Sequence, residues 1–508
     1  MIKNFKWLLL VSLTFVACSK SDDTTAVSNS SDGLPLTAGS ANFSNYVALG
    51  DSFAAGYSDG ALFIEGQKGS YPAILAQQFT QVGGGPFTTP FMNDNVGGFA
   101  GLASLGLGPR LAFFGFYTDP SPLAGLPIVN PISASSTTDI TNHLTGSYNN
   151  MGVPGAKCIH MNYPGYASAN PYFGRFASSA TATIIDDATN QTPSFFSLWI
   201  GGNDVLSYAI SGGTGTDQTG NLNPATYGSN DITDPNVFSS VYNTLITKLT
   251  ANGAKGLVIN IPYIASIPYF TTVPYNHIPL DAPNAAHLNG ATAYGAYNAG
   301  IVQAFNYLVS NNLITRDAAD AEIAKRTINF HAGSDNAVVI MDEYLTDLTA
   351  INPGLISMRQ ATPEDFIVLP ASSFIGTKVN GDATKINGIT VPLADKWVLS
   401  KNEVAQIKTA TDAYNVTIQS LATSKGLAFV DSKAILNNVA NGQYIANGFK
   451  MTSSYLTGNS FSLDGIHASP RGYALIANEC LKAINTAYGS NLKAVDLGNY
   501  RILFPASL

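Results

Sequence analysis

The sequence is poor in charge and in cysteine, and both shortages limit what the protein can do. Charged residues make up 11% of the 508 residues, and the formal net charge is −8. No cluster of lysine and arginine forms the basic surface that a phosphate backbone requires, so no nucleic acid is expected as a partner. With 3 cysteines and no C-x-x-C pair or His/Cys cluster, no metal or other cofactor is expected either.

Hydrophobic residues, in contrast, are abundant. They form 45% of the chain, which also has 47 glycines and 26 prolines. This composition supports a large folded core and argues against a disordered or fibrous protein. The length fits two or three domains of ~150 residues, or one α/β domain that carries insertions.

The first residues have the pattern of a secretory signal. Lys3 and Lys6 precede an apolar run over residues 7–17. That run is too short to span a hydrocarbon layer of ~30 Å, and a basic start followed by a short apolar segment is typical of an export signal.

The end of this run, the sequence FVAC that finishes at Cys18, resembles the bacterial lipobox. The resemblance implies a lipoprotein signal peptide over residues 1–17 and a lipid on Cys18 that anchors the protein stably to a membrane. Residues 18–43, rich in Ser, Thr and Asp, are expected to form a flexible linker. The acidic start of the linker looks like a surface-export signal. We therefore expect an outer-membrane lipoprotein that faces the periplasm or the cell surface.

Two further cysteines, Cys158 and Cys480, leave the question of a disulfide open. They could pair in an oxidising compartment, but their spacing in the sequence does not give their distance in the fold. Cys480 lies on an apolar stripe of helical spacing that includes Ile476 and Ile484. This position favours a buried, free cysteine.

Short apolar runs alternate with helical patterns along the chain, which predicts an α/β protein with a parallel sheet. Strands are expected at 46–49, 194–200, 256–262 and 427–432, and helices at 71–80, 237–250, 400–424 and from 469 onward. A capping box, Ser400 to Glu403, marks the start of the third helix, and Ser469-Pro470 marks the start of the last.

The sequence ALGDSFAAGYSDG over residues 48–60 offers two candidate nucleophiles. Ser58 fits the G-x-S-x-G pattern, in which a serine sits on a sharp turn after a strand. Ser52, however, directly follows the expected strand 46–49, and Ser58 has no strand in front of it. Because open α/β sheets place their ligands at the carboxyl ends of the strands, Ser52 is the better candidate.

Three further motifs follow Ser52, namely NMGVPG at 150–155, GGND at 201–204 and DGIH at 464–467. Together with GDS at 50–52 they resemble, in the same order, the invariant blocks of the SGNH, or GDSL, hydrolase family. The resemblance implies a flavodoxin-like three-layer α/β/α fold with a central parallel sheet, and activity on esters.

The resemblance also implies the role of each residue. Ser52 is the nucleophile, His467 the base and Asp464 the residue that orients the base. Gly155 and Asn203, with the backbone of Ser52, form the oxyanion hole. The chemistry agrees, because a serine attacks only when an oriented imidazole removes its proton, and the intermediate needs fixed donors for its negative charge.

Two details of the match matter for the site. Gly155 is preferred to Gly152 because the family's glycine lies five residues after the asparagine, and Gly152 remains a second candidate. Phe53 stands where the family has leucine, which changes the packing beside the nucleophile and removes no catalytic atom.

The chain is much longer than a minimal domain of this family. We expect a hydrolase domain over 44–490 with insertions at about 81–149 and 263–399, and a C-terminal extension over 491–508. The apolar, glycine-rich segment 97–116 enters between the nucleophile and the oxyanion glycine. It is expected either to overhang the site and bind an acyl chain or a membrane lipid, or to cover the core.

The expected function is that of a membrane-anchored serine esterase that cleaves acyl esters, of lipids above all, without a cofactor. The same residues also serve carbohydrate O-acetylesterases that act on polysaccharides, and this is the alternative. A surface lipoprotein that binds a glycan or a lipid without turnover is a third possibility. The presence of all five site residues argues against that last possibility.

Overall fold

The computed structural model describes residues 33–118 and 126–508, so the expected signal peptide and Cys18 lie outside the described residues. Its centre is a five-stranded sheet in which every neighbouring pair is parallel. The strands are β1 (Tyr46–Gly50), β4 (Asn150–Gly152), β5 (Phe195–Trp199), β6 (Lys255–Ile259) and β13 (Ala428–Val430), in the order β13-β6-β5-β1-β4. Counted along the chain this is the order 2-1-3-4-5, which occurs in doubly wound α/β sheets.

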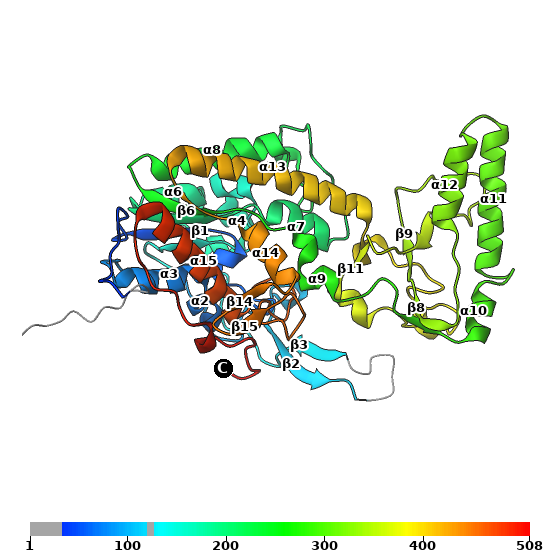
Figure 1. The fold of residues 1–508 in the computed structure, drawn as a ribbon, viewed down its shortest axis with the longest axis horizontal. Coiled ribbons are helices and arrows are strands. Elements are labelled where there is room, and N and C mark those ends of the chain that lie inside the picture. The colour runs from blue at the N-terminus through cyan, green and yellow to red at the C-terminus, as the bar shows by residue number, and fades with distance from the viewer. Residues whose placement is uncertain (1–32, 119–125) are drawn as a thin grey trace, which may run out of the picture.

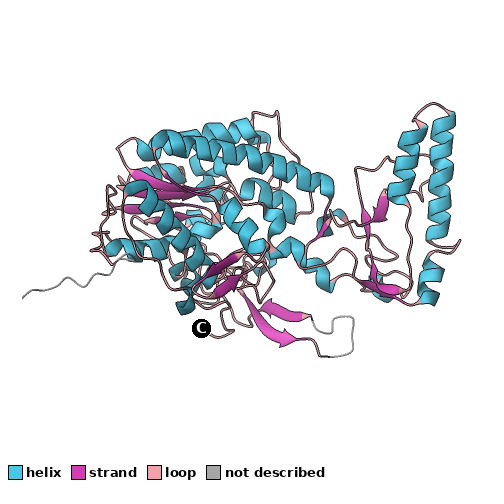
Figure 2. Ribbon diagram, viewed as in Figure 1, coloured by secondary structure: helices cyan, strands magenta, loops and turns pink. Residues whose placement is uncertain are grey.

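Both faces of the sheet are covered by helices, because its strands are apolar on both sides. In β1, Val47 and Leu49 pack into one hydrophobic cluster, and Tyr46 and Ala48 pack into the other. The first cluster includes α8 (Pro235–Thr250) and α13 (Lys401–Lys425), and the second includes α3 (Tyr71–Thr80) and α15 (Pro470–Tyr488). The helices therefore form layers above and below the strands (Figure 1; Figure 2). The α/β class with a parallel sheet is confirmed.

The predicted helix starts are also confirmed. Ser469 Oγ accepts the Gly472 N–H at 3.0 Å at the start of α15, with Pro470 in the first turn. At α13, Glu403 Oε2 accepts the N–H of Ser400 at 2.6 Å, which is the glutamate half of the capping box. The remaining helices of the sheet region are α1 (Ser52–Ala55), α2 (Ile64–Lys68), α4 (Tyr166–Ala169), α5 (Pro171–Gly174), α6 (Ile184–Thr189), α7 (Asn203–Ile210) and α14 (Ser432–Ala440).

The segment between α3 and β4 carries an antiparallel ribbon of β2 (Leu111–Phe116) and β3 (Pro127–Pro131). A second short hairpin, β14 (Tyr444–Ala446) and β15 (Phe449–Met451), lies between α14 and α15. Neither ribbon joins the central sheet.

The long segment between β6 and α13 has a hydrophobic cluster of its own, built from residues 285–358, and it extends to one side of the sheet (Figure 1). Its helices are α9 (Pro268–Thr271), α10 (Ala282–Leu288), α11 (Tyr294–Ser310) and α12 (Arg316–Arg326). Its strands pair only with each other: β7 (Ile278–Leu280) with β8 (Gly333–Asn336), β9 (Val339–Met341) with β10 (Met358–Gln360), and β11 (Phe366–Ile367) with β12 (Val398–Leu399).

Both cysteines of the described chain, Cys158 and Cys480, are buried and free. Cys480 lies on the buried face of α15, as its helical spacing predicts. Among the described residues, no helix is both long and apolar enough to cross a membrane.

Candidate active site

Ser52, His467 and Asp464 form a continuous hydrogen-bonded chain. His467 Nε2 lies 2.8 Å from Ser52 Oγ, and His467 Nδ1 lies 2.8 Å from Asp464 Oδ2. With the ring proton on Nδ1 donated to the carboxylate, Nε2 is free to accept the serine proton. This arrangement can convert the hydroxyl of Ser52 into a nucleophile.

These three residues come from opposite ends of the described chain and meet at this site. Ser52 follows β1 and opens α1, and Asp464 and His467 lie in the loop that leads into α15. Ser52 and His467 are almost fully buried, with residue exposures of 6% and 8%. A buried imidazole between a hydroxyl and a carboxylate is shielded from water that would compete for its hydrogen bonds.

Asp464 is held as an ionised acceptor. Its Oδ1 accepts the backbone N–H groups of Ile466 and His467 and the hydroxyl of Ser462, and its Oδ2 accepts the N–H of Gly60. Burial alone would raise the pKa of Asp464, but the imidazole of His467 and these hydrogen bonds lower it well below the ordinary value. The carboxylate of Asp464 therefore stays charged near neutral pH and fixes the orientation of the His467 ring.

The loop GYSDG, which contains the alternative nucleophile, supports the acid instead. Ser58 is 1% exposed, and its hydroxyl donates to the carbonyl of Ala468 at 3.2 Å. The neighbouring Asp59 accepts the Leu463 N–H at 2.9 Å, and Gly60 donates to Asp464 at 3.0 Å. Ser58 is thus a structural residue, and the loop ties the start of the chain to the acid of the site.

Three groups are expected to hold a substrate oxygen, namely the side chain of Asn203 and the backbone N–H groups of Ser52 and Gly155. Asn203 begins α7 at the end of β5, and its Nδ2 donates to the carbonyl of Ala156 at 3.0 Å. This bond uses one amide hydrogen and leaves the second available. It also holds the loop that contains Gly155 beside the asparagine. Within the described chain, the backbone N–H groups of Ser52 and Gly155 make no intramolecular hydrogen bond. All three groups can therefore donate to an oxyanion.

The geometry separates the two candidate glycines. Gly155 is exposed, has φ +79°, and has open space where a Cβ would stand. Gly152 is buried at the end of β4, its N–H already donates to Asn150 Oδ1 at 3.0 Å, and a Cβ there would collide with the backbone of Ala55. Gly152 therefore serves close packing, whereas Gly155 has a free donor.

Two buried acids lie beside the site. Asp51 precedes the serine, and burial raises its pKa to about 7 although its carboxylate accepts the Phe53 N–H. Burial likewise raises the pKa of Asp204, next to the asparagine, to about 6, although Asp204 accepts the N–H of Cys158. Both are fixed in the protein core by these hydrogen bonds.

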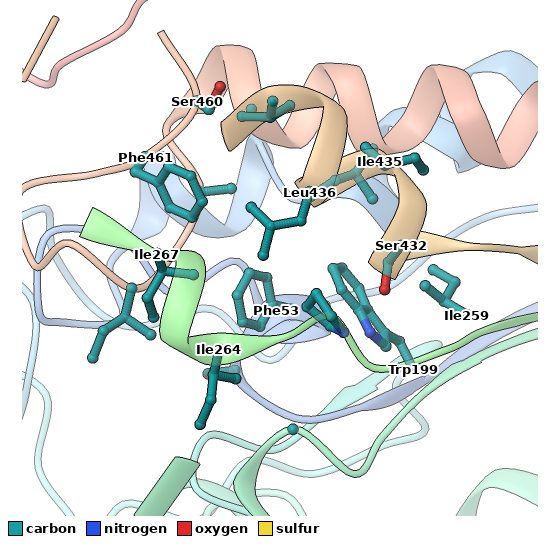
Figure 3. Close-up of a pocket in the computed structure, with 18 of the residues that line it drawn as sticks. Phe53, Trp199, Ile259, Ile264, Ile267, Ser432, Ile435, Leu436, Ser460 and Phe461 are labelled. Atoms are coloured by element: carbon teal, nitrogen blue, oxygen red, sulfur yellow. The ribbon is translucent and has the colours of Figure 1, made fainter. Parts of the chain in front are cut away.

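An apolar cavity of about 110 Å³ opens next to the serine, and Ser52 and Asn203 are among its lining residues. Figure 3 shows Ile435 and Leu436 of α14 on one side, Ile264 and Ile267 of the segment after β6 on the other, and Phe53 and Trp199 between them. Such a lining binds a hydrocarbon group and offers few partners to a polar one.

Phe53, at the position where leucine was expected by resemblance, is part of this wall. Its ring centroid lies 4.8 Å from that of Trp199 and 5.2 Å from that of His467. Tyr57 also lies against the imidazole, with a centroid distance of 4.7 Å. Phe53 therefore joins the base to the wall of the cavity.

The segment 97–116 does not overhang the site. None of its residues lines the cavity, and its Phe99 is buried against Tyr172, with centroids 5.0 Å apart. The expectation that this segment binds an acyl chain is wrong, and its alternative, that the segment covers the core, agrees with Phe99. The apolar wall comes instead from α14, from α15 and from Ile264 and Ile267 at the start of the long insertion, and no sequence pattern had marked these residues as a binding surface.

No family model, no curated protein and no solved structure matches this chain. Within the described chain, one group of side chains could hold a metal ion, namely Glu343, Asp395 and Glu403. None of the three lines the cavity.

Proposed function

We propose that this protein is a serine ester hydrolase of the SGNH type, with a flavodoxin-like three-layer fold, which cleaves acyl esters through an acyl-serine intermediate. The observation that carries the proposal is the hydrogen-bonded chain from Ser52 through His467 to Asp464, which opens onto an apolar cavity. The strand order 2-1-3-4-5 supports it, because β1 and β5 flank the point where ligands bind in such sheets.

The reaction proceeds in two halves. Ser52 Oγ attacks the acyl carbonyl carbon while His467 Nε2 takes its proton, and the carbonyl oxygen becomes an oxyanion held by Asn203 and the N–H groups of Ser52 and Gly155. His467 then gives the proton to the leaving alcohol, and the acyl group stays on the serine. Water, activated by the same imidazole, releases the acid and restores the serine.

The cavity favours acyl groups longer than acetyl. Burial of each methylene stabilises a bound chain by about 0.8 kcal/mol, which is roughly fourfold in kcat/KM. An acetyl group leaves most of the walls formed by Ile264, Ile435 and Leu436 without contact. We therefore infer that the substrate is a lipid-like carboxylester, and that a polysaccharide acetyl ester is the weaker candidate.

A lipid on Cys18 would hold the enzyme at the outer membrane, close to acyl esters of lipids. The resemblance of the sequence FVAC to a lipobox supports this part of the proposal. Metabolic labelling with a radioactive fatty acid tests it, because label should appear in the natural protein and not in Cys18→Ser.

The main experiment measures hydrolysis of nitrophenyl esters from acetyl to palmitoyl by the purified protein, by Ser52→Ala and by Ser58→Ala. Activity should rise with chain length beyond acetyl, fall by about 10⁴-fold or more in Ser52→Ala, and persist in Ser58→Ala, which carries the same exchange six positions away.

A fluorophosphonate provides an independent readout of the nucleophile. It should modify Ser52, identified by peptide mass, and not Ser58. A sharp optimum at acetyl would favour the acetylesterase. If neither ester turnover nor labelling depends on Ser52, the hydrolase proposal is wrong and ligand binding without turnover becomes the leading account.

A further inference from the structure

A second cluster of charged side chains lies outside the candidate active site, where the long insertion meets α13. Glu343 lies in the turn after β9, Asp395 opens the short 3₁₀ helix Asp395–Trp397, and Glu403 lies in the first turn of α13. One carboxylate oxygen from each lies within 4.8 Å of the other two. Glu343 is exposed, Asp395 is half-buried and Glu403 is fully buried.

The negative charge of this cluster is not balanced by a basic side chain. Within the described chain, none of the three carboxylates forms an ion pair, and the nearby Arg359 is already bound to Asp342 and Asp365. The three groups therefore repel one another unless a cation or a proton lies between them.

The deepest member has an oxygen with no partner. Glu403 is 0% exposed, and its Oε2 caps α13 by accepting the Ser400 N–H, but its Oε1 is buried without a hydrogen bond. A buried carboxylate oxygen left in this state is unfavourable when it is charged, and folded proteins meet it with a proton, a paired charge or a metal ion. The capping role explains one oxygen of Glu403 and leaves the other unexplained.

The kind of ligand atom favours calcium. The cluster offers only carboxylate oxygens, which suit hard cations, and Ca²⁺ binds oxygen at about 2.3–2.6 Å in a flexible geometry. Oxygens that all lie within 4.8 Å of one another are compatible with one such ion. Mg²⁺ demands near-ideal octahedral geometry and is usually held by one or two carboxylates with several waters, so three carboxylates favour Ca²⁺. The exposed side at Glu343 leaves room for water as the remaining ligands.

We propose that Glu343, Asp395 and Glu403 bind a calcium ion that fastens the insertion 263–399 to the first turn of α13. This ion joins the first turn of α13, a helix that packs on the sheet, to the turn after β9 and the end of the insertion, which a β-bridge between Ile340 and Leu393 already holds side by side. The site is separate from the serine and its cavity, so the inference does not rest on ester hydrolysis.

The test uses the full purified protein after removal of metal with EDTA. Calorimetric titration with CaCl₂ should give one site per chain with a Kd between about 10⁻⁶ and 10⁻³ M, and MgCl₂ should bind at least about tenfold more weakly. Saturating Ca²⁺ should raise the melting temperature by about 2–5 °C. Tb³⁺ should bind in place of Ca²⁺ and luminesce when Tyr344 or Trp397, close in sequence to the ligands, is excited.

Two variants test whether Ca²⁺ binds at this cluster. Glu343→Gln and Asp395→Asn should each weaken Ca²⁺ binding at least about tenfold and remove the gain in melting temperature. Glu364→Gln is the matched control, because Glu364 is an exposed carboxylate of the same insertion that pairs with Lys401. It should bind Ca²⁺ as the natural protein does.

The proposal fails if Ca²⁺ up to about 10 mM, above the weakest Kd expected, gives neither heat nor a shift in melting temperature. It also fails if both variants bind Ca²⁺ unchanged, since the ion would then lie elsewhere. A third result would favour a shared proton over an ion: Glu403→Gln melts at a higher temperature than the natural protein, and Ca²⁺ has no effect on either. Folding of each variant is checked by circular dichroism before titration.

Discussion

Gly60 donates its backbone N–H to Oδ2 of Asp464 at 3.0 Å and thereby joins the loop after α1 to the loop before α15. The same oxygen lies 2.8 Å from Nδ1 of His467, to which it is hydrogen-bonded. The acid is thus oriented by the segment that follows the serine as well as by its own loop. The serine and the acid are fixed relative to each other by backbone as well as through the histidine.

The first prediction concerns Ser462, whose hydroxyl donates to Asp464 Oδ1 at 3.0 Å and accepts the Asp59 N–H at 3.0 Å. Ser462→Ala should lower kcat about tenfold with little change in KM, because the carboxylate loses one of the bonds that orient it. Steady-state kinetics on the best nitrophenyl ester measures this. In Ser58→Ala, which also removes a buried hydroxyl, kcat should stay within about twofold.

The second prediction concerns Asn203. Asn203→Ala should reduce kcat by about 10²- to 10³-fold and leave KM within a few-fold, because an oxyanion donor acts in the transition state and not on the bound ester. The rate of fluorophosphonate labelling at Ser52 should fall as well, since that reaction also develops charge on oxygen. A raised KM with an unchanged kcat would show that Asn203 only binds the substrate or supports the loop at Ala156.

The third prediction concerns the pH dependence of stability. Burial raises the pKa of Asp51 to about 7, whereas in the unfolded chain an aspartate ionises near ~3.9. Between these values the folded protein binds more protons than the unfolded chain. The contribution of Asp51 to stability is therefore complete below the unfolded pKa and is lost as the pH rises through about 7.

Asp51→Asn removes this ionisation and keeps an oxygen that can accept the Phe53 N–H. Between about pH 5 and pH 7, which lies between the unfolded and folded pKa values, the free energy of unfolding of the natural protein should fall as the pH rises. The fall should be steeper than that of Asp51→Asn by up to about 1.4 kcal/mol per pH unit. Urea unfolding at several pH values measures the difference. Parallel curves for the two proteins would contradict the prediction.

The fourth prediction concerns the acyl cavity. Ile435→Trp should fill part of the space between α14 and Ile264, so that kcat/KM for octanoyl esters falls at least about tenfold while that for acetyl esters stays the same. Ile445→Trp makes the same exchange at a side chain that is 69% exposed on the β14 hairpin, and it should not alter the chain-length profile. Equal losses for short and long esters in Ile435→Trp would indicate damage to the fold.

Strands and helix starts could be predicted from the sequence where the residues that define them are neighbours in the chain. The strands around Val47, Phe196 and Val258 are dense apolar runs, and the helix that begins at Pro470 has its own cap, so local chemistry suffices for each. The residues that meet at the serine were also predicted, because each belongs to a motif at the end of a strand or before a helix. Their contact follows from the parallel sheet.

Structural features that form only when distant segments of the chain meet could not be predicted from the sequence. β4 has only three residues, Asn150–Gly152, with no apolar run, and it becomes a strand because its backbone pairs with β1. The wall of the cavity combines Trp199, Ile264 and Leu436, each of which has the pattern of an ordinary core residue in its own segment.

The expected role of segment 97–116 went wrong for a related reason. The apolar composition of this segment correctly indicated that it would bury side chains, but composition does not show which surface a loop covers. Phe99 finds its partners in the core, beside Tyr172, and not at the cavity. In the same way, the cluster of Glu343, Asp395 and Glu403 has no motif, because its spacing in the sequence resembles no metal-binding pattern.

The hydrogen bond between Ser52 and His467 spans 415 positions of the chain, and this separation sets the order in which the two residues of the proposed site are synthesised. At a synthesis rate of about 5–20 residues per second, the base follows the nucleophile by roughly 20–80 s. During that interval the first strand, the oxyanion loop and the whole insertion can be made and can fold while the serine has no base. A chain that ends before His467 would lack the proposed base, so the proposed activity requires a chain whose translation is nearly complete.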